Sequence, residues 1–371
     1  MARTAVTGND YTPTLRKTAW SELLFRDTLV ETYFAQRFAG DAYSKLEKGM
    51  PFESSPNDII HIKEDLEGKG PSKAKGKGDE LVFGLIPRID PKTNAGVTSG
   101  QKLKGKEVAL SMYYFSLELE RYRQAVSAGT PLDQQRVGFD LQDEARSALK
   151  NWGVEKMDLL CFTALDVSTS TTFFYKTSSG VTKTTTAATA KSALTVADGK
   201  ITPAMVSFMK AWAITGGARA SGQIPLRPVK VGGRNYYVLL VHPDVMYDWK
   251  QDSTVFQAMR EAEVRGKENP IFQGASYIWD NVVIHENENI TIGTDAGSGS
   301  DVPYALCHFL GAQALCWAWG ERPSIVEDTD DYEEDFFQAW RVTCKVGKPI
   351  FNSKVYGSFS VYAARTNVSG A

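Results

Sequence analysis

The chain has 371 residues, of which 42% are hydrophobic and 23% are charged, and its 42 lysine and arginine residues nearly balance 44 aspartate and glutamate residues. This composition is typical of a soluble globular protein with a large core, and the balanced charge argues against a protein whose whole surface binds nucleic acid. No segment approaches the roughly 18 consecutive apolar residues of a membrane helix, and the N-terminus lacks the apolar core of a secretory signal.

The N-terminal residues combine an irregular arm with one predicted helix. Residues 1–13 show no periodicity, whereas residues 15–38 follow a helical period. The apolar positions that share one face of this helix are Trp20, Leu23, Leu24, Val30, Phe34 and Phe38. Asp27 lies on the same face, which indicates a buried ion pair, a contact with another chain, or a different phase for the helix.

The next segment changes to the period of two that is typical of strands. Three strands are predicted over 57–66, 79–89 and 106–119, and all are rich in β-branched and aromatic residues. A stretch of glycine, proline and lysine joins the first two strands and carries Lys69, Lys73, Lys75 and Lys77. Because this composition cannot form a core, we expect it to be the exposed tip of a long hairpin made by the first two strands.

The strongest helical pattern covers residues 133–165. Its apolar face is formed by Val137, Leu141, Ala145, Ala148, Trp152 and Leu159. An unbroken helix of this length would span about 50 Å, which is long for a globular domain, and Gly153 is the position where it would bend. A loop or edge region rich in serine and threonine follows it.

A second compact unit is predicted to begin near residue 193. A helix opens at Thr202 and Pro203, and the residues predicted for its inner face are Met205, Val206, Met209, Trp212 and Ala213. Residues 236–241 form an apolar run that Pro243 follows closely, which is typical of a strand buried on both faces. Further strands are predicted over 276–292, 305–319, 335–351 and 353–364. The fold class is therefore mixed α+β.

Residues with catalytic or metal-binding chemistry are few. None of the common nucleotide-binding or hydrolase motifs is present, and His61, His242, His285 and His308 have no partners that the sequence identifies. Cys161, Cys307, Cys316 and Cys344 lack metal-site spacing and are predicted to be buried, inert thiols. We therefore expect no catalytic, cofactor-binding or metal-binding residues and no enzymatic activity.

The run EDTDDYEED over 327–335 is the most acidic segment of the chain. It lacks the glycine that a calcium loop of the EF-hand type requires. A solvated loop between two strands is the simplest interpretation, and contact with a basic partner surface is the alternative.

The order of these elements resembles that of the major capsid proteins of tailed bacteriophages, which have the Hong Kong 97-type fold, and is most similar to the coliphage N-four-like group. The segments that carry the resemblance are TLRKTAWSELLFRDTLVETYFAQRFAG, GVTSGQKLKGKEVALSMYYFSLELERYRQAV, DQQRVGFDLQDEARSALKNWGVEKMD, YVLLVHPDVMYDWKQD and NPIFQGASYIWDNVVIHEN. The resemblance covers most of the chain in order, and it depends on overall pattern rather than on a catalytic signature.

The resemblance implies a division of the chain into the parts of that fold. These would be an N-terminal arm and first helix (1–50), an extended hairpin called the E-loop (51–128), a P-domain spine helix with its following loop (129–192), an A-domain (193–302), P-domain return strands (303–347), and a closing A-domain strand with the C-terminus (348–371). Val137, Leu141, Ala148, Trp152 and Leu159 would be the packing residues of the spine.

The resemblance also implies a function in the virion. The chain would assemble in the host cytoplasm as pentamers and hexamers, forming an icosahedral shell that encloses double-stranded DNA without sequence-specific binding or membrane contact. A separate scaffolding protein, a portal and a decoration protein would be its other partners. The inter-subunit contacts are expected at the lysines Lys69, Lys73, Lys75 and Lys77 and at the acidic residues Asp328, Asp330, Asp331, Glu333 and Glu334.

Three alternatives remain open at this point. An encapsulin-type nanocompartment shell has the same fold but stores an enzyme rather than a genome. A hydrolase built on residues 193–302 is the enzymatic alternative, and a tail or portal-associated protein is the third.

Overall fold

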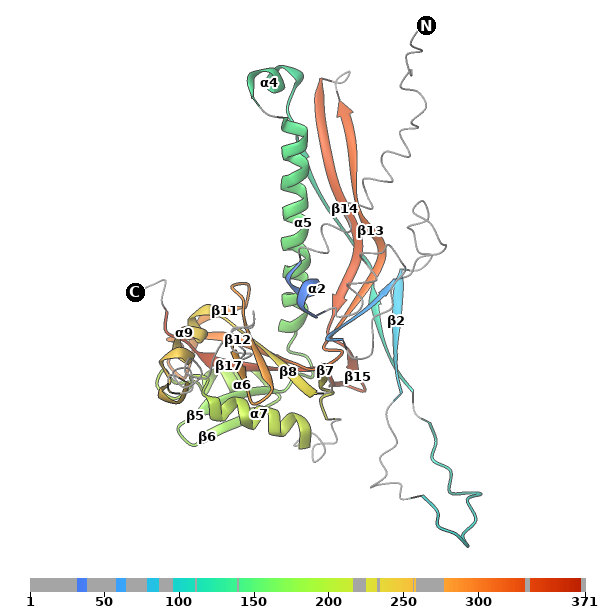
Figure 1. Cartoon of the computed structure of the whole chain (residues 1–371), viewed down its shortest axis with the longest axis vertical. Helices are drawn as coiled ribbons and strands as arrows, with labels where there is room; N and C mark the ends of the chain where they lie inside the picture. Colours follow the sequence, from blue (N-terminus) through green and yellow to red (C-terminus); the bar gives the residue numbers. More distant parts are fainter. Residues whose placement is uncertain are drawn as a thin grey trace.

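The computed structural model divides into an elongated unit, a compact unit and a projecting arm (Figure 1). Its described residues are 32–38, 58–64, 79–86, 96–110, 112–138, 140–215, 225–231, 234–255, 257, 277–330 and 334–367. In this part of the chain, no helix combines the length and the apolar character needed to cross a membrane.

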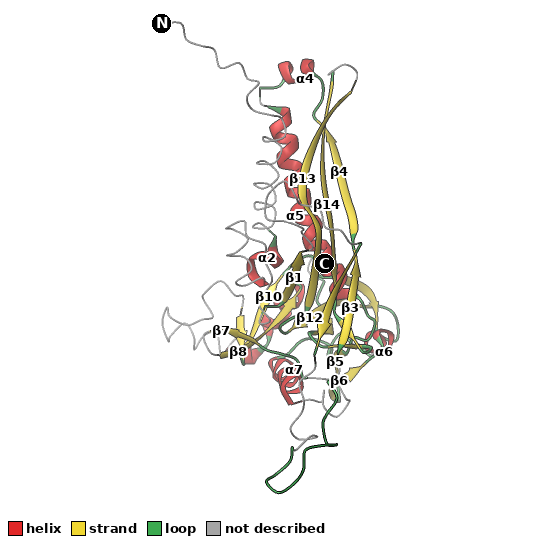
Figure 2. Cartoon of the chain, turned by 90° about the vertical axis from the view of Figure 1, so that its right-hand side faces the viewer, coloured by secondary structure: helices red, strands yellow, loops and turns green. Residues whose placement is uncertain are grey.

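The elongated unit is a long helix lying along a narrow four-stranded sheet (Figures 1 and 2). Helix α5 (Leu141–Asp166) begins at the N-cap Asp140, whose side chain accepts a hydrogen bond from the backbone N–H of Gln142. The strands, in spatial order, are β1 (Ile60–Glu64), β13 (Leu315–Asp330), β14 (Asp335–Gly347) and β4 (Glu120–Ser127). Strands β13 and β14 form one long antiparallel ribbon, and the shared core contains Trp317, Trp319 and Trp340.

Two short helices complete the elongated unit. Helix α4 (Pro131–Arg136) starts with a capping box between Thr130 and Asp133 and lies at the same end of the unit as the start of α5 (Figure 1). Helix α2 (Tyr33–Phe38) crosses the other half of α5, where Phe34 and Phe38 are buried. The expected helix over 15–38 is therefore seen at its C-terminal end, and residues 1–31 lie outside the described residues.

The compact unit is built on a nine-stranded mixed sheet. The main strand order is β6 (Gly180–Thr184), β5 (Phe173–Thr177), β17 (Ser358–Ala364), β12 (Val302–Leu310), β8 (Arg234–Val241), β10 (Val282–Glu286) and β9 (Tyr277–Trp279), with β7 (Val229–Val231) beside β8 and β11 (Ile292–Ala296) beside β12. Helices α6 (Ala187–Ser192), α7 (Pro203–Thr215) and α9 (Pro243–Gln251) pack around it. The predictions for the apolar run that ends at Val241 and for the inner face of α7 are confirmed, since Tyr237 to Val241 and Met205, Val206, Met209, Trp212 and Ala213 are buried.

The strand pairing observed in the arm differs from the predicted pairing, which is therefore wrong. Strand β2 (Glu80–Leu85) pairs antiparallel with β3 (Tyr113–Glu118), whereas β1 pairs parallel with β13, some 250 residues along the chain. The hairpin is therefore made by the second and third predicted strands, and its distal part includes residues 96–110 (Figure 1). Periodicity identified the strands, but it carries no information about which strand is the partner. A small pair, β15 (Ile350–Phe351) and β16 (Lys354–Val355), lies near the arm.

Two other predicted boundaries shift. The helix predicted over 133–165 is two helices, since Val137 is the C-cap of α4 and α5 begins only at Leu141. Strands β5 and β6, which we assigned with the spine to residues 129–192, pair within the compact sheet, and so does β12, which we assigned to the return strands after 303. The serine- and threonine-rich sequence around β5 and β6 masked their strand character, because their buried residues are the short cluster Phe173 to Tyr175.

Candidate subunit interface

The inner face of the arm is packed against the elongated unit. Leu81, Phe83 and Leu117 point to the same side of the hairpin and are buried against Cys316 and Ala318 of β13. The alternation of buried and exposed residues in β2 follows the period of two that the sequence predicted. This packing fixes the base of the arm on the sheet.

The outer face and the distal segment of the arm are apolar and exposed. The exposed fraction is 76% for Tyr114, 67% for Met112, 66% for Leu110 and 60% for Leu103. Val82, Ile86 and Val108 are also exposed on this arm. Because monomeric proteins rarely expose large groups of apolar side chains, this surface is the strongest candidate for contact with another chain.

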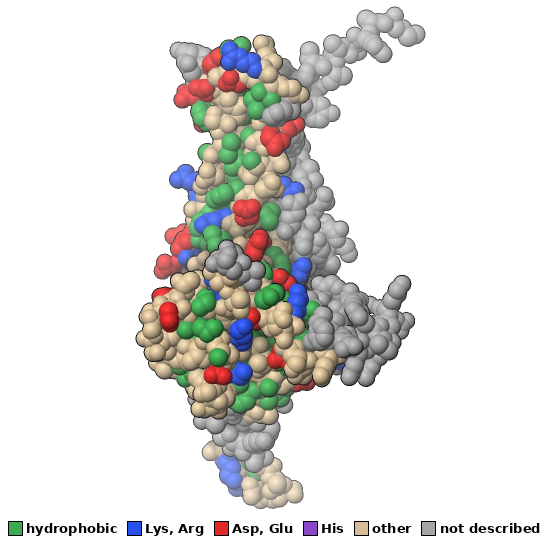
Figure 3. Space-filling model, turned by 90° about the vertical axis from the view of Figure 1, so that its left-hand side faces the viewer, with side chains coloured by type: hydrophobic (Ala, Val, Ile, Leu, Met, Phe, Trp, Pro, Cys, Tyr) green, Lys and Arg blue, Asp and Glu red, His purple; other side chains and the backbone are tan. Residues whose placement is uncertain are grey.

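The described lysines at the end of the arm differ from those that we predicted. Lys69, Lys73, Lys75 and Lys77 lie outside the described residues. The distal segment instead carries Lys102, Lys104 and Lys106, all exposed, and basic side chains are visible at this end of the molecule in Figure 3. These lysines are not predicted at the tip because the sequence places the tip between the first two predicted strands, whereas the hairpin joins the second and third.

The acidic segment lies at the opposite end of the molecule from the arm tip, where the β13–β14 ribbon ends (Figures 1 and 2). It is less of a loop than predicted, since Asp328 and Asp330 belong to β13 and β14 begins at Asp335. Glu334 lies in the turn, and Asp331 and Glu333 are outside the described residues. Glu327 forms an ion pair with Arg146 of α5 at 3.0 Å, which ties the ribbon to the helix.

The packing face of α5 is rotated from the predicted one. Ala148 and Leu159 are exposed, Leu141 is half-buried at the first turn, and Val137 lies outside the helix. Ala145 is buried as predicted, and the other buried residues of the helix are Leu149, Gly153, Met157, Asp158, Cys161, Phe162, Ala164 and Leu165. The predicted pattern runs from Val137, the C-cap of α4, across the turn into α5, and it matches the packing face only at Ala145 and the half-buried Trp152.

Trp152 and Gly153 form the centre of the contact between α5 and the ribbon. The half-buried Trp152 ring packs edge-on against the buried ring of Trp340, with centroids 5.2 Å apart. A Cβ atom on Gly153 would lie 2.9 Å from Cε2 of Trp340. Gly153 therefore allows close packing within a continuous helix and does not bend it.

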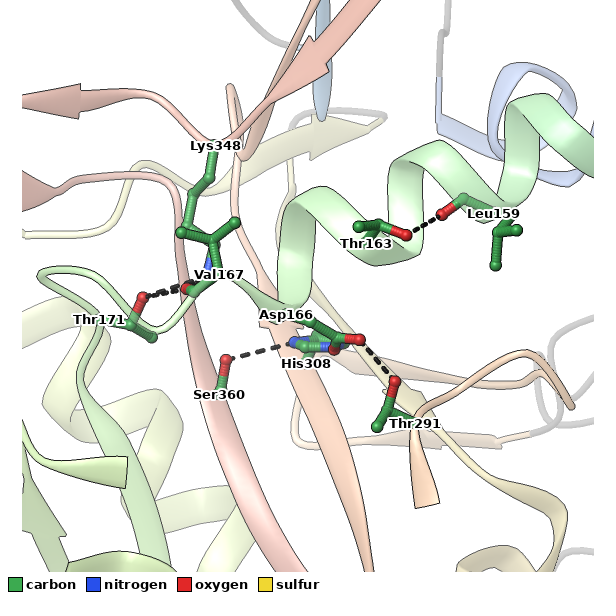
Figure 4. A network of polar contacts seen from close by, with 9 residues as sticks. All are labelled: Leu159, Thr163, Asp166, Val167, Thr171, Thr291, His308, Lys348 and Ser360. Atoms are coloured by element: carbon green, nitrogen blue, oxygen red, sulfur yellow. Dashed lines mark hydrogen bonds and ion pairs between the residues drawn. The ribbon is translucent and has the colours of Figure 1, made fainter. Parts of the chain in front are cut away.

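A serine, a histidine and an aspartate lie in a row where α5 meets the compact sheet (Figure 4). His308 Nδ1 is 3.3 Å from Ser360 Oγ, and His308 Nε2 is 3.0 Å from Asp166 Oδ1. His308 and Ser360 are each only 1% exposed, and burial lowers the pKa of His308. A nucleophile needs access to a substrate, so this buried row is a structural link rather than a catalytic triad.

The environments of His242, His285 and the four cysteines also indicate structural roles. His242 is the N-cap of α9 and accepts a hydrogen bond from the backbone N–H of Asp244. Burial and the nearby Arg37 lower the pKa of His285 to about 4. The four cysteines are buried, and burial raises the pKa of Cys307 and Cys344 to about 12. Within the described residues, no cluster of three or more histidine, cysteine or acidic side chains is arranged to hold a metal ion.

The sequence of the chain matches a known protein family over most of its length. A family model described as phage capsid protein matches residues 11–344. A curated relative, the major capsid protein of Pseudomonas phage KPP25, is 25% identical over 394 residues, which cover 94% of this chain and 95% of the relative.

Solved phage capsid structures have the same fold. The capsid of Ralstonia phage GP4 matches with a TM-score of 0.71 at 23% identity, covering 92% of this chain and 93% of that chain. The capsid asymmetric unit of cyanophage Pam1 matches with a TM-score of 0.67 at 21% identity, covering 84% of this chain and 90% of that chain. At these identities the likeness establishes the fold.

Proposed function

This chain belongs to the phage capsid protein family, and from this premise we propose that its copies assemble as pentamers and hexamers into an icosahedral shell around double-stranded DNA. The chain is a major capsid protein that forms the phage head shell, so its location is the virion and its role is structural rather than enzymatic. The predicted mixed α+β fold is confirmed and is of the Hong Kong 97 type. Membership of the coliphage N-four-like group is part of the proposal, and the five quoted sequence segments support it.

In this proposal each part of the molecule has a counterpart in that fold. The arm corresponds to the E-loop, the elongated unit to the P-domain with α5 as its spine, and the compact unit to the A-domain. The strand pairing supports moving the start of the A-domain from 193 to about residue 173, where β5 begins, and moving the return to the P-domain to Leu315.

One observation carries the proposed mode of assembly, namely the exposed apolar surface of the arm. Leu110, Met112 and Tyr114 have no cover from the described residues of their own chain, and each is more than 60% exposed. Burying such side chains contributes roughly 1.5–3 kcal/mol each. A second copy of the chain is the partner that is present in every shell, so the arm is proposed to lie across a neighbouring subunit.

The two ends of the molecule are proposed to attract each other between copies. The basic end would include Lys102, Lys104 and Lys106, and the acidic end would include Asp328, Asp330 and Glu334. The contacts expected at Lys69, Lys73, Lys75 and Lys77, and at Asp331 and Glu333, stay separate predictions. The two surfaces are different and lie at opposite ends of the molecule. The contact would therefore be heterologous, joining unlike surfaces of two copies, as ring-forming interfaces do. Single exposed ion pairs contribute only about 0–1 kcal/mol and weaken with salt, so this contact would guide assembly rather than hold the shell together.

The remaining partners are also proposals. A scaffolding protein encoded separately, a portal and a decoration protein would act with this chain, and DNA would be enclosed without sequence-specific contacts. Unlike these partners, other copies of the same chain are required by capsid assembly itself.

Electron microscopy of the protein, expressed alone and together with its neighbouring genes, tests the proposal. Closed icosahedral particles are expected under at least one of the two conditions. A triple variant of the arm, Leu110→Ser, Met112→Ser and Tyr114→Ser, is expected to abolish particles while leaving the subunit folded. A monodisperse monomer under both conditions, or normal particles from the triple variant, would contradict the proposal.

A further inference from the structure

The compact and elongated units are joined by three crossings of the chain. Residues 167–172 lead from α5 to β5, residues 311–314 lead from β12 to β13, and residues 348–357 lead from β14 to β17. A change in the angle between the units requires these three crossings to move relative to one another. The contacts among them therefore determine how rigid the joint is.

Polar side chains link the end of α5 to the compact sheet, and two of them, His308 and Ser360, are buried (Figure 4). Asp166, in the last turn of α5, contacts His308 of β12, and its second carboxylate oxygen accepts a hydrogen bond from Thr291. His308 in turn contacts Ser360 of β17. One carboxylate thus connects the helix with three separate parts of the compact unit.

A buried lysine links the first crossing to the third. Lys348 is only 3% exposed, and its ammonium group donates to the backbone carbonyl of Val167 at 2.9 Å and to Thr171 Oγ1 at 3.1 Å. Val167 is the C-cap of α5, so the positive charge lies at the negative end of the helix dipole. Burial lowers the pKa of Lys348, and the negative charge of Asp166 partly offsets this effect, so that the pKa is about 8.

The second and third crossings touch through their backbones. The N–H of Gly311 donates to the carbonyl oxygen of Gly357 at 2.8 Å. A Cβ atom on Gly357 would lie 2.3 Å from the carbonyl oxygen of Gln313, so no other residue fits there without movement of the backbone. Direct contacts therefore join the first crossing to the third through Lys348, and the second to the third through Gly311 and Gly357.

We propose that this joint, formed by Asp166, His308, Ser360 and Lys348, sets the angle between the two units and thereby the curvature of the assembled shell. The inference depends on the proposed assembly into shells. Apolar contacts tolerate sliding, whereas buried hydrogen bonds are directional and are lost when the angle changes. A chain with a loosened joint is expected to keep both of its cores and to assemble with a wider range of curvatures.

Lys348→Met tests the joint, because methionine retains much of the side-chain length and removes both hydrogen bonds. Lys191→Met is the control, since Lys191 pairs with Asp295 at 2.7 Å within the compact unit and forms no hydrogen bond or ion pair with the four joint residues. Cryo-electron microscopy of particles from the wild type and both variants measures the distribution of diameters. We expect a single narrow class from the wild type and from Lys191→Met, and at least one additional diameter class or a clearly broader distribution from Lys348→Met. Particles of unchanged diameter and width from Lys348→Met would overturn the inference.

A second measurement uses the free subunit and does not depend on assembly. Spin labels on cysteines introduced at the exposed positions Ala148 of α5 and Lys250 of α9 report the distance between the units, and the four native cysteines are buried. Loss of the joint contacts in Lys348→Met, or in the milder Ser360→Ala if the first variant does not fold, should broaden this distance distribution. Distributions identical to that of the parent would overturn the inference, whereas failure of the wild type to form shells would contradict the proposed function alone.

Discussion

The face of α5 that meets the ribbon and the outer face of the arm are both rich in large apolar side chains, but only the first is complete within one chain. Trp340 and Met157 are fully buried between α5 and β14, whereas Tyr114 and Met112 are among the most exposed side chains of the described residues. The difference shows which apolar groups stabilise the subunit and which are available for assembly. Substitutions in the two regions should therefore separate folding from shell formation.

The largest effect is expected from Trp340→Ala. The ring is fully buried in the core of the elongated unit, and its loss should lower the free energy of unfolding by about 3–5 kcal/mol. Trp152→Ala should cost less, because Trp152 is only half-buried. Denaturant unfolding of both variants measures this, and equal losses would show that the helix face is misassigned.

Gly153→Ala and Gly84→Ala compare one substitution in the two regions. At Gly153 the added methyl group meets the Trp340 ring, and we expect a net loss of about 1–3 kcal/mol despite the better helix propensity of alanine. At Gly84 in β2 nothing lies within 4 Å of the added atom, so little change is expected. Thermal unfolding distinguishes the two, and a stabilised Gly153→Ala variant would show that the helix and ribbon are not closely packed.

The pH dependence of folding should reveal Asp158, which is buried on α5 and accepts hydrogen bonds from the backbone N–H groups of Tyr33 and Phe34. Burial outweighs these bonds and raises the pKa of Asp158 to about 6. A carboxyl whose pKa is raised in the folded state favours folding below its unfolded pKa of about 4, and this contribution is lost as the pH rises through about 6.

Asp158→Asn should remove this loss. We expect the variant to gain about 1–2 kcal/mol relative to the wild type between pH 4 and pH 7.5, because asparagine accepts a hydrogen bond without carrying a charge. Unfolding curves at both pH values test the expectation. Identical pH dependence in the two proteins would show that Asp158 does not titrate in this range.

The smallest effect on the subunit is expected from the arm tip. Replacing Lys102, Lys104 and Lys106 by glutamate should change the free energy of unfolding by less than about 0.5 kcal/mol, because these side chains are exposed. Assembly should nevertheless become slower, and added salt should partly restore it. Light scattering during assembly measures the rate, and an unchanged rate at low salt would remove the tip from the interface.

Local patterns in the sequence predict many elements of this fold, although not β5 and β6, and they do not predict which elements pair. The strand period identified β1, β2 and β3, a continuous apolar run identified β8, and the helical period identified the inner face of α7. The pairing of β1 with β13, however, joins residues about 250 positions apart, and such contacts leave no periodic signal. The predicted face of α5 is only partly correct for a local reason, since the prediction continues one helix through the turn between Val137 and Leu141.

The polar contacts were the least predictable features. Asp158, Lys348 and the Asp166–His308 pair each contact residues more than 120 positions away. A lone aspartate on an otherwise apolar helix face is the sequence feature that indicates a buried polar contact. It points to Asp27 in the first predicted helix, whereas the predicted face of the long helix does not include Asp158. The exposed apolar arm, in contrast, was predictable in kind, because an extended hairpin has little of its own chain to pack against.

A cryo-electron microscopy structure of the assembled shell tests the central claim most directly. The measurement is the exposure of Leu110, Met112 and Tyr114 in the shell, compared with the free subunit, where each is more than 60% exposed. We predict that all three side chains are buried against a neighbouring copy of the chain. A shell in which they remain exposed to solvent would contradict the account.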